Sequence, residues 1–175
     1  MLPIVAYGSP FLRKTAQEIQ ADDPNLEKLI KQMFESMYES KGVGLAAPQI
    51  GQSIRLFIID ASPYETDDIL AKNFKKVFIN PKIIEETGNE WLFNEGCLSV
   101  PGINEDVKRK EVVEIEYQDE NFEWHREKYS GIIGRIIQHE YDHLDGKLFV
   151  DRLSPLVKTL IKGKLAKISK GNVDV

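Results

Sequence analysis

The sequence has few cysteines and histidines and no long apolar run. Cys97 is the only cysteine among 175 residues, so no disulfide can form within the chain, and a reducing, cytoplasmic location is expected. No apolar run approaches the ~20 residues that span a bilayer, and no basic stretch precedes an apolar one at the N-terminus. We therefore expect neither a membrane span nor a signal peptide. The formal net charge of -5 argues against a basic surface for binding DNA.

Three segments have the apolar spacing of an α-helix, and the length of 175 residues suits one domain, 1–175. A cap residue precedes each helix. The expected helices are 24–41, with Asp23 as its cap and Pro24 in its first position; 131–145, between Ser130 and Gly146; and a basic one at about 155–168, after Ser154.

Other segments have the composition or the alternation of β-strands. They are 53–60, 77–86 and a hairpin over 111–128, in which Phe122 and Trp124 are expected on the apolar side and His125 on the exposed side. A polar insert over about 61–76 predicts an exposed loop with a short helical turn. Strands precede the main buried helix without regular βαβ alternation. The pattern therefore predicts an α+β fold, with antiparallel sheets packed around a central helix and a further helix at the C-terminus.

The central helix carries the spacing H-E-x-x-H. His139 and His143 are four residues apart, so both imidazoles can reach one metal ion, and Glu140 lies ~100° from His139 around the helix. An ordinary amphipathic helix with packed histidines is the alternative. The glutamate between the histidines favours the metal site.

A third ligand is needed, because catalytic zinc-type sites use three protein ligands. A metzincin-like protease would have histidine where Phe149 stands, so that class fails at its last ligand. Cys97 lies in "NEGCLSVPG", an irregular stretch that suits presentation of a thiolate, although an inert buried cysteine is the commoner case. The glycines on both sides of Val43 allow close approach of another backbone, either a substrate strand or a plain turn.

Together, three stretches resemble the signature motifs of the peptide deformylase family. They are "GVGLAAPQ" at 42–49, "EGCLS" at 95–99 and "QHEYDH" at 138–143, in the family's order and at similar spacing. The similarity covers essentially the whole chain. It implies a catalytic domain that removes the N-formyl group from the N-terminal methionine of newly synthesised polypeptides and releases formate.

The resemblance also implies a role for individual residues. Ferrous iron is the implied cofactor, although a Cys-His-His site also suits zinc, nickel or cobalt. The implied metal ligands are Cys97, His139 and His143; the general acid/base is Glu140; the oxyanion donors are the Gln49 side chain and the Leu98 backbone N–H; and Gly44 lies on the edge that receives the substrate.

The resemblance also concerns residues beside the motifs. Three of them are either walls of a methionine pocket or ordinary core, namely Val43, Leu98 and Ile136. Glu95 and Arg109 match a family ion pair that braces the metal loop. Gly134 stands where the family usually has alanine, which predicts close packing.

The expected partners are N-formylmethionyl nascent peptides, with no DNA, membrane or obligate protein partner. Five lysines and no acid lie between 155 and 170, which fits either a solvated helix face, the favoured interpretation, or contact with the ribosome through its RNA. The rival functions are a metallopeptidase that cleaves internal peptide bonds and a non-catalytic metal-binding homologue.

Overall fold

The computed structural model describes residues 1–171, so positions 172–175 of the predicted domain 1–175 lie outside the described residues. Within that range one antiparallel sheet has the strand order β1-β2-β3-β4-β5. The strands are β1 (Gly44–Ala46), β2 (Leu56–Asp60), β3 (Lys75–Cys97), β4 (Val100–Gln118) and β5 (Trp124–Ser130), and the helices are α1 (Leu26–Glu39), α2 (Gly131–Leu144) and α3 (Pro155–Ser169).

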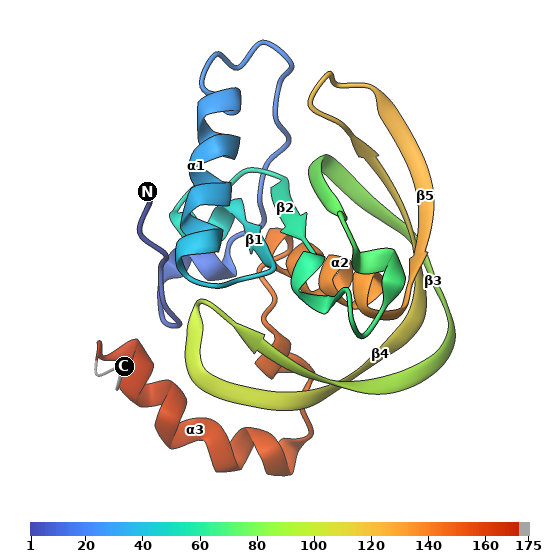
Figure 1. The fold of residues 1–175 in the computed structure, drawn as a ribbon. Helices are drawn as coiled ribbons and strands as arrows, with labels where there is room; N and C mark the ends of the chain where they lie inside the picture. The colour runs from blue at the N-terminus through green and yellow to red at the C-terminus, as the bar shows by residue number, and fades with distance from the viewer. Residues whose placement is uncertain (172–175) are drawn as a thin grey trace.

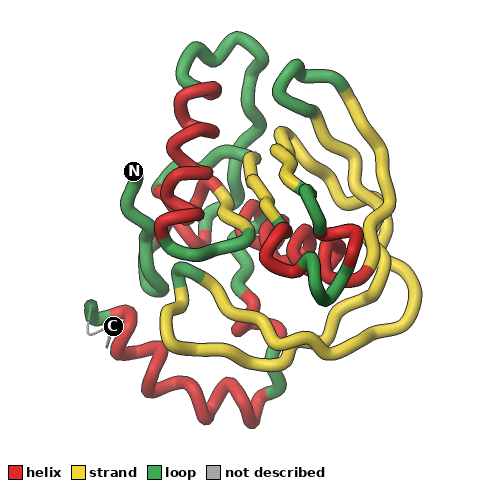
Figure 2. Tube along the Cα trace, viewed as in Figure 1, coloured by secondary structure: helices red, strands yellow, loops and turns green. Residues whose placement is uncertain are grey.

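The α2 helix lies at the centre, and the sheet curves around it (Figure 1). It packs against β1, β2, β4 and β5, whereas α1 contacts β1 and β2, and α3 contacts β4. The long β3–β4 hairpin is not flat, since its register shifts at four places, the last between Gly96 and Cys97. Figure 2 shows this bent hairpin in yellow, with its closed end turned toward the helices. The predicted α+β fold around a central helix is confirmed.

The α2 helix begins and ends near the predicted positions. Ser130 is its N-cap in extended conformation, although its side chain makes no capping hydrogen bond, and Gly146 follows the helix at a φ of 71°. A Cβ at Gly134 would lie 3.1 Å from the carbonyl oxygen of Tyr129, so the predicted close packing is confirmed. The apolar face is buried, at Ile132, Ile133, Ile136, Ile137 and Leu144.

The predicted start of the first helix is wrong. The helix begins at Leu26 with Asn25 as its N-cap, and Asp23 instead accepts a hydrogen bond of 2.9 Å from the Asn25 backbone N–H. This Asx turn uses the carboxylate before the helix starts, so Pro24 belongs to the turn. The strand expected over 77–86 is only the first part of β3.

The predicted facing of Trp124 and His125 is also wrong, whereas Phe122 is half-buried against the apolar core as predicted. Trp124 is 59% exposed, and His125 is half-buried, stacked on Tyr117 and 2.7 Å from a carboxylate oxygen of Asp119. The pairing explains it, because His125 lies opposite the buried Tyr117 and Trp124 lies opposite Gln118, and residues directly opposite each other share one face of the sheet.

The C-terminal helix α3 begins as predicted, with the Ser154 hydroxyl accepting a hydrogen bond from the Val157 N–H. Its Ile161 and Ile168 are buried against the closed end of the hairpin. The insert over 61–76 holds two short 3-10 turns and is exposed over most of its length. In residues 1–171 no helix combines the length and the apolar character needed to cross a membrane.

Candidate metal centre and active site

Two distant parts of the chain meet at one group of possible metal ligands. Cys97 is the last residue of β3, and His139 and His143 lie on the inner face of α2. One ligand atom from each lies within 4.8 Å of the others, and the Cys97 Sγ is 3.5 Å from the Nε2 of His143. One sulfur and two imidazole nitrogens in a mostly buried site are donors that suit a transition metal rather than calcium or magnesium.

The two imidazoles differ in their surroundings, but each can turn one ring nitrogen to a metal. His139 Nδ1 lies 2.8 Å from Glu95 Oε1, and a carboxylate there holds the proton on Nδ1 and leaves Nε2 free to bind a metal. Burial lowers the pKa of His143 to about 3, so its ring is neutral at physiological pH. Burial opposes protonation of His139, but its contacts with Cys97 and Glu95 raise the pKa of this ring well above its usual value, so a metal bound at Nε2 would displace a proton. The donor set therefore fits the metal that the motifs imply.

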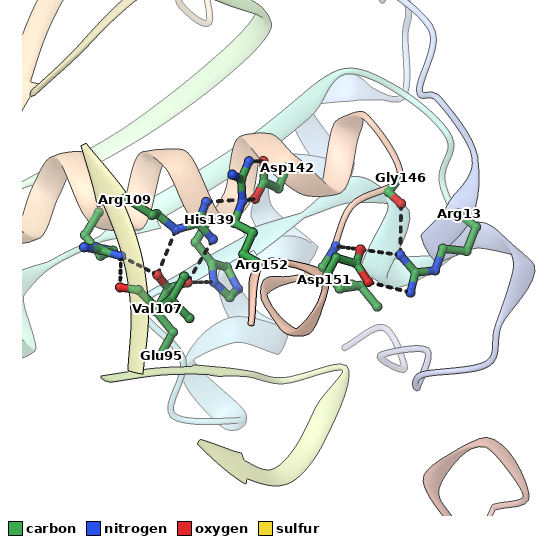
Figure 3. Close-up of polar contacts among 11 residues, drawn as sticks. Arg13, Glu95, Val107, Arg109, His139, Asp142, Gly146, Asp151 and Arg152 are labelled. Carbon is green, nitrogen blue, oxygen red and sulfur yellow. Dashed lines mark hydrogen bonds and ion pairs between the residues drawn. The ribbon is translucent and has the colours of Figure 1, made fainter. Parts of the chain in front are cut away.

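A buried network of ion pairs holds Glu95 in place (Figure 3). Arg109 donates two hydrogen bonds to Glu95, of 2.8 and 3.0 Å, and a third of 2.8 Å to Asp142. Arg135 donates a further bond of 2.8 Å to Glu95. Burial opposes ionisation of Glu95, but the bonds from His139 and Arg109 outweigh it and hold the pKa of this carboxyl well below its usual value.

Part of this network was not predicted. The motifs predicted the pairing of Glu95 with Arg109 but not the parts of Arg135, Asp142 and Arg152. Arg152 donates two hydrogen bonds of 2.7 Å to Asp142. The sequence held one indication of the part played by Arg135. This residue lies four positions before His139, on the face of the helix with the isoleucines, and an arginine there indicates a buried carboxylate partner.

Glu140 is buried beside the ligand cluster and takes no part in the network. Its Oε1 is 4.0 Å from the Nε2 of His139, and its Oε2 has no hydrogen-bond partner among the described residues. A Cβ at Gly44 would lie 2.7 Å from Oε1, so only glycine leaves room there for this carboxylate. Burial raises the pKa of Glu140 to about 7. A carboxyl group with a spare oxygen and such a pKa can both accept and donate a proton near neutral pH.

The Gln49 side chain reaches the same place from the short 3-10 turn after β1. Its Oε1 accepts a 2.9 Å hydrogen bond from the Ala46 N–H, which fixes the direction of the amide. Its Nε2 donates to the Ser99 hydroxyl at 3.1 Å and lies 3.5 Å from the Cys97 Sγ. The amide N–H groups thus face the ligand cluster. Ser99, which orients the amide, was missed by the sequence analysis.

A cavity of about 430 Å³ opens beside these groups. The predicted pocket residues Val43, Gly44, Leu98 and Ile136 all line it, together with the metal cluster's Cys97 and His139 and with Gln49 and Glu140. The lining residues that the motifs did not indicate include Lys41, Tyr64 and Phe93. β1 is the edge strand of the sheet and pairs only with β2, so its other side can receive an extended peptide.

A buried Cys-His-His cluster with an unpartnered carboxylate and a cavity beside it is the arrangement of a metal-dependent hydrolase. Comparison with known proteins agrees. Residues 1–159 match the family model described as polypeptide deformylase. The chain is 55% identical over 182 residues to a peptide deformylase of Christiangramia forsetii, an alignment that covers 100% of this chain and 93% of the relative.

Solved structures give the same result. A peptide deformylase of Plasmodium falciparum matches with a TM-score of 0.86 at 40% sequence identity, and the match covers 96% of this chain and 95% of that protein's chain. A peptide deformylase of Thermotoga maritima matches with a TM-score of 0.80 at 40% sequence identity, and the match covers 89% of this chain and 99% of that protein's chain. The chain therefore belongs to the peptide deformylase family, as its motifs predicted.

Proposed function

We propose that residues 1–171 act as one catalytic domain that hydrolyses the formyl amide at the N-terminal methionine of newly made polypeptides and releases formate. One observation carries the proposal: the unpartnered Glu140 carboxylate faces the Cys-His-His cluster at the end of a cavity that an unpaired strand edge borders. Membership of the peptide deformylase family supports it. A non-catalytic metal site would need neither the free carboxylate nor the amide of Gln49.

In this proposal the cavity binds the methionine side chain and the strand edge binds the peptide backbone. Val43, Leu98 and Ile136 supply apolar walls, and such walls suit an unbranched thioether side chain. Gly44 lies on the free edge of β1, where an extended peptide adds main-chain hydrogen bonds. These contacts place the N-terminal amide of the substrate beside Glu140.

Cys97, His139 and His143 would hold the metal ion, which when bound polarises the formyl group and makes water more acidic. Glu140 takes one proton from the attacking water and delivers it to the amine nitrogen as the carbon–nitrogen bond breaks. The hydroxyl of the water becomes part of formic acid, which ionises to formate, and the proton that it loses protonates the free amino group of the peptide, so every atom of the water is accounted for. The Glu140 carboxylate returns to its starting state.

Negative charge develops on the formyl oxygen as water adds, and two neutral donors are assigned to it. They are the Nε2 amide of Gln49 and the backbone N–H of Leu98. The bond from Ala46 to Gln49 holds the amide in advance, so little reorganisation is needed during the reaction. Neither donor places a negative charge next to the oxyanion.

The decisive assay compares two peptides that differ only in the formyl group. We expect formate release from formyl-Met-Ala-Ser and no cleavage of the unformylated peptide. A metallopeptidase would instead cut an internal bond of either peptide. Cleavage of internal bonds without formate release would reject the proposed function.

We propose ferrous iron as the metal, because the family resemblance implies it, and the donor set also accepts zinc, nickel or cobalt. We predict that protein purified without oxygen contains about one iron per chain and loses more than 90% of its formate release after chelation. Metal analysis and the formyl-peptide assay on one sample check this. Anaerobic protein that is fully active with zinc and free of iron would contradict the assignment.

We also propose a ribosome contact through α3, although the sequence alone favoured a solvated face. The lysines are exposed, and Leu156 and Leu160 beside them are 70% and 71% exposed, which a solvated face does not require. Deleting the helix would uncover core around Ile161, so substitution is the better test.

We predict that replacing Lys158, Lys162 and Lys164 by glutamine weakens co-sedimentation with ribosomes and reduces the slope of log affinity against log salt by about 2 to 3. The control variant replaces three exposed lysines far from α3 in sequence, which are Lys14, Lys28 and Lys72. Equal binding by both variants would leave α3 as a solvated face.

A further inference from the structure

Lys41 lies at the mouth of the cavity in a conformation that lysine rarely adopts. It directly follows the C-cap of α1, at a φ of 58°, where glycine is the favoured residue. Its N–H donates to the Tyr38 carbonyl at 3.0 Å, and the next N–H, of Gly42, donates to the Met37 carbonyl at 2.9 Å. These two bonds form a Schellman motif, which keeps the backbone of Lys41 left-handed. The chain therefore retains a lysine where backbone conformation favours glycine.

The charge of Lys41 is not neutralised within residues 1–171. Two cationic side chains other than histidine line the cavity, Lys41 and Arg135, and Arg135 is paired with Glu95. No ion pair or side-chain hydrogen bond of Lys41 occurs among the described residues, and its side chain is exposed. The acid nearest α1 on the neighbouring strand, Asp60, accepts hydrogen bonds from Tyr38 and Ser62 instead.

The position of Lys41 along the substrate edge sets which part of a peptide it would meet. Gly44 lies against Glu140, and Lys41 is three residues before it, on the turn that leads from α1 into β1. Beyond Gly44 the edge is closed, since Leu45 and Ala46 are fully buried, whereas Lys41 is exposed, so a peptide whose formyl end lies at Glu140 would leave the cavity on the side of Lys41. Its third or fourth residue then comes opposite the lysine.

We infer that Lys41 is a specificity-determining residue that favours formylated peptides with a carboxylate at their third or fourth position. The inference rests on the proposed function, since it assigns a preference to the same cavity. The carboxylate would pair with the ammonium group in a solvent-exposed setting. Such a pair changes binding modestly and leaves the bond-breaking step alone.

The test uses formyl-Met-Ala-Ala-Ala amide and three versions with one glutamate at the second, third or fourth position. For the wild type we expect kcat/KM to rise about three- to fivefold with glutamate at position three or four, through KM, and to rise less at position two. In Lys41→Asn and Lys41→Gly this advantage disappears, and in Lys41→Arg it remains. Asparagine and glycine both tolerate a positive φ, so these variants keep the fold.

The control is Lys31→Asn, which removes the same charge from an exposed position of α1 that does not line this cavity. It should keep the wild-type preference, and 0.5 M salt should reduce that preference. An acid preference that survives in Lys41→Asn, or none in the wild type, overturns the inference alone. If the wild type leaves the all-alanine formyl peptide intact, the proposed function fails first and the inference falls with it.

Discussion

Replacing Glu140 by glutamine should lower kcat for formyl-peptide hydrolysis by about a thousandfold, within the range that general acid–base catalysis supplies. Glutamine has nearly the same shape but cannot take a proton from water. Metal content should stay at the wild-type level, because Glu140 is not among the three ligand residues, Cys97, His139 and His143. Formate release and metal analysis of the same preparation measure the two quantities separately.

The stability of the Glu140→Gln variant should equal or exceed that of the wild type. The carboxylate is buried and one of its oxygens has no partner within residues 1–171, so the charged form is poorly solvated there. Glu140→Asp is the matched variant, since it keeps the charge but withdraws it by one methylene group. A Glu140→Gln protein that keeps both its metal and its turnover would remove Glu140 from the acid/base role.

Some residues of the site could be predicted from local sequence patterns and others could not, for a physical reason. His139, Glu140 and His143 share one helix turn, so their spacing alone reports that they meet. The sulfur of Cys97 joins them through the bend of the β3–β4 hairpin, which no local pattern encodes. Only the resemblance of three separate motifs connected the thiolate to the helix before the structure was considered.

Local patterns predicted the fold where one face of an element is buried throughout. The α2 helix followed its isoleucine spacing, and α3 began at its Ser154 cap. Errors came where the geometry of a turn decided the outcome. The turn before β5 brings His125 opposite the buried Tyr117, and the Asx turn of Asp23 moves the start of α1. The full length of the 23-residue strand β3 could not be predicted from the sequence either, because each register shift interrupts the alternation that marks a strand.

The second large effect concerns Arg109, which the structure places between two buried carboxylates. Its guanidinium bonds both Glu95 and Asp142, and all three side chains are at least nine-tenths buried. Arg109→Ala leaves these charges with fewer partners, and breaking a buried pair from one side typically costs about 3–5 kcal/mol of unfolding free energy. Urea unfolding, with the midpoint and slope fitted separately, measures that loss.

Metal retention should fall together with stability in Arg109→Ala. Glu95 orients His139 through Nδ1, and a carboxylate that loses its arginine no longer holds the ring in one position, so we expect metal affinity to drop about 10- to 100-fold. Arg109→Lys keeps the positive charge but cannot form two parallel hydrogen bonds to Glu95. Its metal affinity should therefore lie between those of the wild type and Arg109→Ala.

Arg13→Ala provides the control for both measurements, because Arg13 makes a similar double contact with Asp151 at an exposed site (Figure 3). Exposed pairs contribute about 0–1 kcal/mol, so this variant should unfold close to the wild type and keep its metal. Equal losses of unfolding free energy in the Arg13 and Arg109 variants would mean that the buried Glu95 network contributes no more to stability than an exposed ion pair. Unchanged metal content in Arg109→Ala would separate the network from the metal site, although Glu95 contacts the ligand His139 and Asp142 directly precedes the ligand His143.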